Sequence, residues 1–292
     1  FIFKFLIFCF ILFFLNQNIN FNNLHGEYSL NFNSFIILII IFTLLFLITF
    51  LIIIRWRNLL TIISSEKIPT KSLISPVIYG IFLSEISFLG AFVSRTFLLL
   101  PYNIKTKDVL ISTFYEKILS FFFLSIFILP SILFLFYRDT QIFVGYSLYF
   151  IYFLFILFIL LLVLIIFRVK VINLVKNYLN LFGSNYLVLL DTSKLKIPFL
   201  LTIYIQIISY VCLLLVPAMI NIEVNYVNYI FLLPLIIFLF SMPISISDWG
   251  WRELIFIFTL QFVDITAEQS FLISITFGSI TLINSMLIII IY

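Results

Sequence analysis

Charged residues are scarce in this chain: only 10% of its 292 residues are Asp, Glu, Lys or Arg, whereas 64% are hydrophobic. A soluble domain carries about 25% charged residues. A soluble protein of this size could not cover so apolar a chain with polar surface. The mean hydropathy of +1.31 therefore excludes an ordinary soluble protein and predicts a polytopic membrane protein.

Residue types that carry metal or covalent chemistry are almost absent. The only histidine, His25, lies in a polar segment, which excludes a histidine-based metal site and a Ser–His–Asp triad. Cys9 and Cys212 each lie in an apolar stretch without a second cysteine at metal or redox spacing, which favours packing roles for both. We therefore expect no catalytic residue, no metal, no cofactor and no nucleic-acid partner, and we do not expect an enzyme.

Long charge-free runs, in contrast, are abundant. A helix needs about 20 apolar residues to cross a bilayer. Two segments, 72–94 and 248–268, are apolar but interrupted: the first contains one proline, two glycines and Glu85, and the second contains five charged residues. We predict an all-α, polytopic integral membrane helical bundle, with about seven spans plus one or two re-entrant or broken helices. The runs expected to span are 34–54, 118–137, 143–167, 198–222, 224–247 and 269–292, with a shorter one at 1–15.

The two ends of the chain add little to this organisation. The first residue is Phe rather than Met, so we expect the initiator to be missing. Residues 1–15 have the basic residue and apolar run of a signal peptide, but no small-residue cleavage pattern follows, so we keep them as a first span. We expect residues 1–292 to form a single transmembrane domain without a soluble catalytic domain.

The loops differ in charge. Loops 55–71, 95–117 and 168–196 carry net charges of +3, +2 and +4, whereas loops 16–33 and 223–226 contain one acidic residue each and no Lys or Arg. Lys and Arg accumulate on the cytoplasmic side of a membrane. This pattern predicts that the three basic loops share the cytoplasmic side.

Whether all three basic loops can lie on the cytoplasmic side depends on the path of segment 72–94. If this segment crossed the membrane, the most basic loop, 168–196, would lie outside. If it dips in and returns to the same side, all three basic loops are cytoplasmic and the N-terminus is inside. Non-helical backbone at membrane depth is tolerated only when it is buried in protein or lines a watery cavity. We therefore predict a re-entrant segment at 72–94 beside a cavity.

One charged string stands out at 241–256. Asp248, Arg252 and Glu253 lie within six residues at the start of an apolar segment. Ionisable residues at membrane depth are costly and usually face the interior of a bundle, and the fork of a guanidinium suits phosphate. The functional interpretation is a site for an anionic headgroup. The alternative is a solvated loop with a helix N-cap at Ser247 or Asp248 and Glu253 in the first turn.

Glu85 is the second candidate, because it lies inside an otherwise apolar stretch. A buried carboxylate needs a partner, and Arg95 and Arg252 are the candidates. We predict that Glu85 faces the same interior cavity as Arg252. The alternative is a Glu85 that is protonated or near the membrane interface. Two further groups fit simple anchors at the ends of spans: Arg55, Trp56 and Arg57 in one, Glu116 and Lys117 in the other.

Four strings occur in an order that resembles a known family. They are ITFLIIIRWRNLL at 48–60, the interrupted segment ending at Arg95, STFYEKILSFF at 112–122 and PISISDWGWRE at 243–253. Together they resemble the membrane domain of lysylphosphatidylglycerol synthases and the related stand-alone flippase-like membrane proteins. The resemblance covers about residues 34–260. The positions that match the family pattern are Arg95, Glu116, Trp249, Gly250, Arg252 and Glu253.

Two departures leave the identity of a headgroup open. The re-entrant stretch of the family usually reads Pro-Gly-x-x-Gly-Gly-Asp, but residues 87–92 here read Ser-Phe-Leu-Gly-Ala-Phe. Asp248 and Trp251 also stand where small residues are usual. The soluble aminoacyl-transfer domain of the family follows its membrane domain, and this chain ends at Tyr292, so we do not expect it to synthesise an aminoacyl lipid.

The resemblance implies a flippase-like translocator of an anionic phospholipid or lipid-linked headgroup in a bacterial inner membrane. Arg252 and Arg95 would bind the anion, and Glu253, Glu85 and Glu116 would balance charge, with Asp248, Trp249 and Gly250 beside them. One alternative is a non-transporting membrane subunit that assists a glycosyltransferase or envelope-polysaccharide enzyme on lipid-linked substrate. A further alternative is a membrane-embedded transferase acting on a polyprenyl phosphate. The expected partners are membrane lipids, lipid-linked sugars or envelope-biosynthesis enzymes.

Overall fold

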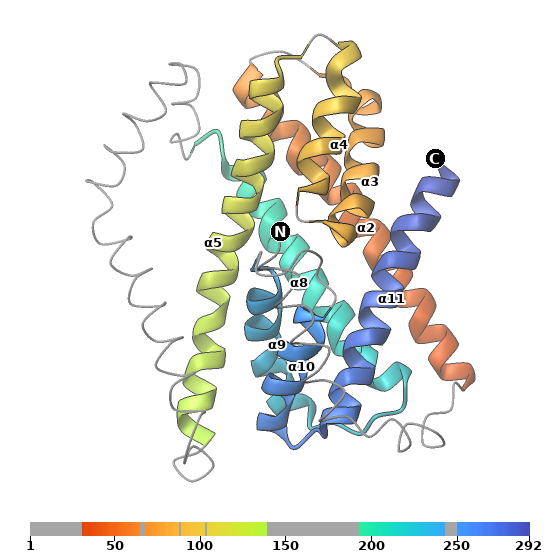
Figure 1. Cartoon of the computed structure of the whole chain (residues 1–292). Helices are drawn as coiled ribbons and strands as arrows, with labels where there is room; N and C mark the ends of the chain where they lie inside the picture. Colours follow the sequence, from red (N-terminus) through yellow and green to blue (C-terminus); the bar gives the residue numbers. More distant parts are fainter. Residues whose placement is uncertain (1–30, 65–67, 88, 103, 139–192, 243–249) are drawn as a thin grey trace, which may run out of the picture.

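A computed structural model of the chain describes residues 31–292 except 65–67, 88, 103, 139–192 and 243–249 (Figure 1). The described residues form helices, turns and loops without a strand. The predicted all-α fold is therefore confirmed for this part of the chain. The expected spans 1–15 and 143–167 lie outside the described residues.

Four helices are long and apolar enough to cross a membrane. Even the shortest of them, with 24 residues, is about 36 Å long at 1.5 Å per residue, which exceeds the roughly 30 Å of a bilayer core. Each contains one of the predicted runs 34–54, 118–137, 198–222 and 269–292, or all but its last one to three residues. The helices are α2 (Phe32–Ser64), α5 (Thr106–Arg138), α8 (Lys196–Met219) and α11 (Ala267–Ile291).

The run 224–247 does not form a full span, and here the structure corrects the prediction. Helix α9 (Tyr226–Phe240) has 15 residues, about 22 Å, which is too short to cross a bilayer core. Helix α10 (Trp251–Leu260) turns back beside it. The short helix η4 (Gln261–Val263) then leads into α11. Arg252 and Glu253 of the charged string thus lie in the first turn of the second helix of a hairpin instead of at the end of a span.

Segment 72–94 also forms a hairpin. Helix α3 (Thr70–Ile86) is followed by α4 (Gly90–Leu99), and the short helix η2 (Leu100–Tyr102) precedes α5. Helix α4 packs along α3 and returns to the end of the molecule from which α3 started (Figure 1). The chain therefore folds back here in the way that the re-entrant interpretation requires.

Helix α5 shows how deep the two hairpins reach. Phe134, close to the last residue of α5, stacks on Phe231 of α9 with ring centroids 5.2 Å apart, and Phe121, in the middle of α5, lies 5.0 Å from Phe238. Helix α9 therefore runs antiparallel to α5 and ends level with its middle. From the upper end, Arg95 of α4 reaches Glu116 of the same helix. The tips of both hairpins thus approach the middle of α5 from opposite ends.

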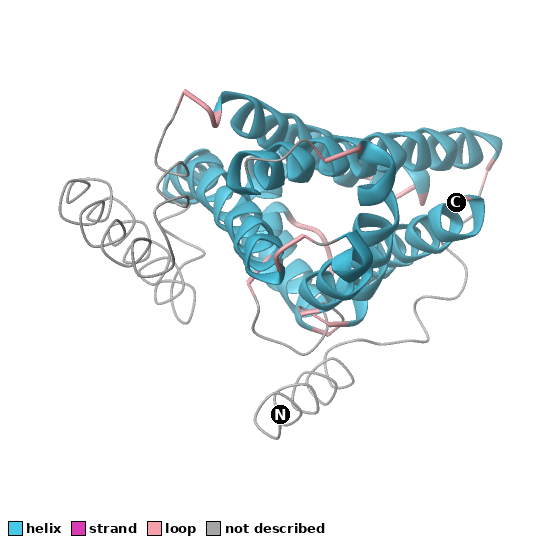
Figure 2. Cartoon of the chain, turned by 90° about the horizontal axis from the view of Figure 1, so that it is seen from above, coloured by secondary structure: helices cyan, strands magenta, loops and turns pink. Residues whose placement is uncertain are grey.

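The described helices form two units of opposite orientation. In the first, α2 rises in Figure 1, the α3–α4 hairpin enters from the upper end, and α5 descends. In the second, α8 descends, the α9–α10 hairpin enters from the lower end, and α11 rises. Helix α2 packs along α8, which joins the units. Figure 2 shows from above how their helices surround the middle of the molecule.

Most of the apolar core lies in the lower half. Tyr229, Phe238 and Phe256 are fully buried there, in a cluster to which α2, α5, α8 and α11 also contribute. A smaller cluster, which includes Trp56 and Leu73, packs the first hairpin against α2. Both hairpins are therefore held by apolar packing, which leaves their polar side chains available for other roles.

The upper and lower ends of the molecule in Figure 1 differ in the sign of their charged side chains. The starts of α3, α5 and α8 meet at the upper end, where they carry five exposed lysines. Among the described side chains, the lower end carries three acidic residues, Glu223, Asp264 and Glu268. The lysines of the upper end are Lys71, Lys105, Lys107, Lys194 and Lys196.

This arrangement predicts the outcome of accessibility labelling. In a chain whose Cys9 and Cys212 are replaced by Ser, single cysteines at Lys105 and Lys194 should react with an impermeant maleimide from the same face of the membrane. A cysteine at Glu223 should react from the opposite face. Labelling of Lys105 and Lys194 from opposite faces would contradict the topology.

Candidate functional site

Two arginines from different helices share one buried carboxylate. Arg55 of α2 donates from Nη2 to Oε1 of Glu116 on α5, and Arg95 of α4 donates from Nη1 to Oε2, both at 2.5 Å. The side chains of all three are at most 5% exposed. The three residues form what we call the arginine cluster, and it ties the first hairpin to both long helices of its unit.

Hydroxyl groups complete the surroundings of Arg55. Its Nη1 donates to Ser120 Oγ at 3.1 Å and to Thr202 Oγ1 at 3.2 Å. Thr202 belongs to α8, so the second unit also reaches the cluster. Its hydroxyl in turn donates to the Pro198 carbonyl oxygen at 2.8 Å. These contacts fix the guanidinium of Arg55 in one orientation.

Arg95 is held by an aromatic face. Its guanidinium carbon lies 4.5 Å from the centroid of the Trp56 ring, a distance at which a cation is attracted to the face of an indole. Trp56 is itself fixed, because its Nε1 donates to Ser112 Oγ at 3.1 Å. Gly80 of α3 lies beside Arg95, and a Cβ there would be 3.5 Å from Arg95 Nε. Both arginines are therefore positioned before any ligand binds.

The arginine cluster has an excess of positive charge and unused donors. Two guanidinium groups and one carboxylate give a net charge of +1 in a buried position. Among the described residues, neither Arg55 Nε nor Arg95 Nε has a hydrogen-bond partner, although both atoms are buried. Buried polar groups without partners are rare and costly. An anion that accepted both N–H groups would satisfy the donors and neutralise the charge.

The structure corrects the anchor interpretation of two charged groups. Arg55 and Trp56 are buried, and only Arg57 of that triplet is exposed. Helix α5 begins at Thr106, so Glu116 lies in its third turn and not at its mouth. Of the predicted site residues, Arg95 and Glu116 are brought together here, and Arg55 was missed.

A second buried ion pair lies in the other hairpin. Arg252 donates from Nε and Nη2 to Oε1 of Glu253 at 3.2 and 3.0 Å, and Ser274 Oγ of α11 donates to the same oxygen at 3.2 Å. The backbone N–H of Gly250 donates to the other carboxylate oxygen. The guanidinium lies directly on Gly278 of α11, where a Cβ would be 1.9 Å from Nη2. This pair joins α10 to α11.

The loop interpretation of the 241–256 string is wrong about solvation, because Arg252 and Glu253 are 2% and 3% exposed. Its placement of Glu253 in the first turn of a helix is confirmed. The N-cap of α10 is Gly250, with a φ of 85°, rather than Ser247 or Asp248. Asp248 and Trp249 lie outside the described residues. Ser274 and Gly278 were not predicted as site residues. They are two small residues four positions apart on one face of α11, and such a pair is a signal of close helix packing.

Glu85 lies near the end of α3 and is half-buried. The two arginines proposed as its partners bind other carboxylates: Arg95 binds Glu116, and Arg252 binds Glu253. Whether Glu85 faces the same cavity as Arg252 stays a prediction. The described site residues thus fall into two groups, one at the first hairpin with Glu116 of α5 and one at the second hairpin, instead of gathering at one point.

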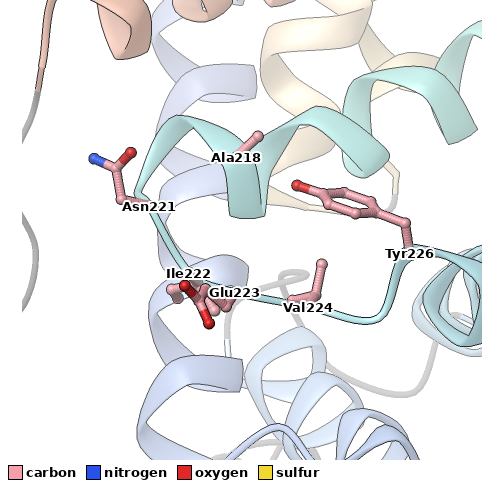
Figure 3. A pocket seen from close by; sticks show the side chains of 6 residues that line it. All are labelled: Ala218, Asn221, Ile222, Glu223, Val224 and Tyr226. Carbon is pink, nitrogen blue, oxygen red and sulfur yellow. The ribbon is translucent and has the colours of Figure 1, made fainter.

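A surface recess of about 530 Å³ lies at the turn between α8 and α9 (Figure 3). None of the predicted site residues lines it, and it contains one acidic side chain and no basic one, which does not suit an anion. No group of three or more metal-ligating side chains occurs in the described part of the chain. The lining residues are Ala218, Asn221, Ile222, Glu223, Val224 and Tyr226.

Comparison with known proteins agrees with the resemblance noted in the sequence. A family model described as the lysylphosphatidylglycerol synthase TM region matches residues 1–289. The chain belongs to this family. No curated protein and no solved structure matched the chain. Membership in the lysylphosphatidylglycerol synthase TM family, together with four long apolar helices, makes the chain a multi-pass integral membrane protein with a function related to membrane lipids.

Proposed function

We propose that the chain translocates an anionic phospholipid or a lipid-linked phosphate headgroup across a bacterial inner membrane, with its N-terminus and its lysine-rich end in the cytoplasm. The observation that carries this proposal is the arginine cluster: a buried, net-positive group with two unused N–H donors in a protein of a lipid-related membrane family. The distribution of lysines supports the orientation.

In the proposed mechanism the headgroup phosphate accepts hydrogen bonds from Nε of Arg55 and Nε of Arg95. Glu116 compensates much of the positive charge while the site is empty. Because Arg95 lies on the α3–α4 hairpin and its partners lie on α2 and α5, a movement of that hairpin opens the cluster to the lysine-rich end. The lysines there attract anionic headgroups to the opening.

The opposed hairpins favour translocation over an accessory role. Paired broken segments in two halves of inverted orientation are typical of transporters, which expose a central site alternately to the two sides. In the second unit Arg252 is the corresponding cation, and Glu253 neutralises it in this conformation. We propose that Arg252, with Gly250 and Glu253, receives the headgroup when the α9–α10 hairpin opens toward the other end.

Proteoliposomes provide the test. Fluorescent phosphatidylglycerol in the inner leaflet should become accessible to dithionite faster in vesicles with the protein than in vesicles without it. Arg55→Lys keeps the charge but removes the Nε–H fork, so it should slow this exchange by about tenfold or more. Arg57→Lys, the same substitution two residues along α2 at an exposed position, should be close to wild type.

Two results would overturn the proposal. One is a wild-type rate equal to that of protein-free vesicles, which would favour the accessory-subunit alternative. The other is a well-folded Arg55→Lys protein that exchanges lipid as fast as Arg57→Lys, since the arginine cluster would then have no part in the process.

A further inference from the structure

The charge of the arginine cluster limits which anion it can hold. Resting on the proposed function, we infer that the cluster selects headgroups with one negative charge on phosphate, as in a phosphodiester, over doubly charged phosphomonoesters. Glu116 sets this selectivity by lowering the charge of the site from +2 to +1. The bound headgroup and the three charged side chains then form a neutral group inside the protein.

Burial makes this charge balance decisive. The side chains of Arg55, Arg95 and Glu116 are 4%, 4% and 5% exposed, so water and salt screen an excess charge poorly. Leaving a net charge in such a position is costly unless it is paired. A singly charged phosphodiester brings the cluster to zero, whereas a dianion leaves it at −1 with Glu116 facing like charge.

The number of unused hydrogen-bond donors in the arginine cluster also favours a phosphodiester. Most of the hydrogen-bonding capacity described for Arg55 is used: Nη2 on Glu116 and Nη1 on Ser120 and Thr202. Arg95 Nη1 is used by Glu116 as well. Within the arginine cluster, the buried atoms without a partner among the described residues are the two Nε–H groups. A phosphodiester presents two unesterified oxygens, one for each Nε–H, whereas a phosphomonoester presents three strong acceptors and so needs a donor beyond these two.

Binding can be measured apart from transport. The detergent-purified full chain should be heated at pH 8 with short-chain phosphatidylglycerol or short-chain phosphatidic acid, whose monoester is then mostly doubly charged because its second pKa is about 6. A ligand that binds only the folded state raises the midpoint of unfolding. We expect phosphatidylglycerol to bind wild type about tenfold more tightly than phosphatidic acid, or more, since like charges in contact are strongly unfavourable.

Three variants test whether the charge of the arginine cluster causes the preference for phosphatidylglycerol. Glu116→Gln raises the site to +2 and should reverse the preference toward phosphatidic acid. Arg55→Gln brings the site to zero while keeping the Arg95–Glu116 pair, and should reduce binding of phosphatidylglycerol about tenfold. Glu268→Gln makes the same charge change as the first variant at the start of α11, and should keep the wild-type preference.

The outcomes separate this inference from the proposed function. Equal binding of the two lipids by wild type would overturn the selectivity and leave the headgroup site in place. Stabilisation by neither lipid would overturn the headgroup site itself. If Glu116→Gln does not fold, Arg55→Gln decides. Unchanged affinity for phosphatidylglycerol in that variant would overturn the inference. A loss of affinity for both lipids, with phosphatidic acid still the weaker ligand, would support it.

Discussion

Glu116→Gln should lower the free energy of unfolding by about 3–5 kcal/mol, because it leaves two buried guanidinium groups without their shared carboxylate. The loss should appear as a lower yield of monodisperse protein in detergent and a lower midpoint of thermal unfolding. Glu268→Gln removes the same charge at the half-buried start of α11 and should change stability by less than about 0.5 kcal/mol.

A double variant separates electrostatics from simple loss of packing. Arg55→Gln combined with Glu116→Gln removes one positive and one negative charge, so a single cation, Arg95, remains over Trp56. The combined loss should therefore be smaller than the sum of the two single losses, since residues in one ion-pair network couple. Strictly additive losses would show that Arg55 and Glu116 stabilise the protein independently.

Hydropathy predicted the long helices well and the second hairpin poorly. Charge-free runs such as 34–54 and 118–137 fall inside helices α2 and α5, because length and apolarity alone satisfy the bilayer. The same criterion counted 224–247 as a span, although α9 ends at Phe240. A half-length helix buried among other helices is as apolar as a crossing one, so composition cannot distinguish them.

The arginine cluster was harder to predict than the Arg252–Glu253 pair. Arg252 and Glu253 are neighbours in sequence, whereas Arg55 and Glu116 are 61 residues apart. An arginine at the end of an apolar run also has an ordinary explanation as an interfacial anchor. A usable signal lies on α5, where Ser112, Glu116 and Ser120 follow one another at intervals of four residues and so share one helix face.

All three side chains of that stripe are engaged in the structure. Ser112 accepts from Trp56, Glu116 from both arginines and Ser120 from Arg55. Polar residues at helical spacing inside an apolar helix therefore marked the interior face of α5. What the sequence could not provide was the partner, because only the folding of α2 and α4 against α5 brings the cations to that face.

The first hairpin depends on a glycine at its tip, and Gly90→Ala should be among the most destabilising single substitutions in the chain. A Cβ at Gly90 would lie 2.2 Å from the carbonyl oxygen of Leu83 and 2.3 Å from its carbonyl carbon. These are backbone atoms of α3, so a side-chain rotation cannot relieve the clash. We expect a loss at or above about 3 kcal/mol, the upper end for overpacking, measured as the midpoint of thermal unfolding in detergent.

Gly80→Ala is the matched control, because it adds the same methyl group to the same hairpin. Its Cβ would meet Ser94 Oγ at 3.0 Å, and a hydroxyl group can turn away. Alanine also favours a helix interior by up to about 1 kcal/mol over glycine, so this variant should stay within about 1 kcal/mol of wild type. Because α4 carries Arg95, the backbone shift forced by Gly90→Ala should also separate Arg95 from Glu116 and slow lipid exchange in proteoliposomes. Equal stability of the two variants would show that α3 and α4 do not approach as closely as the structure indicates.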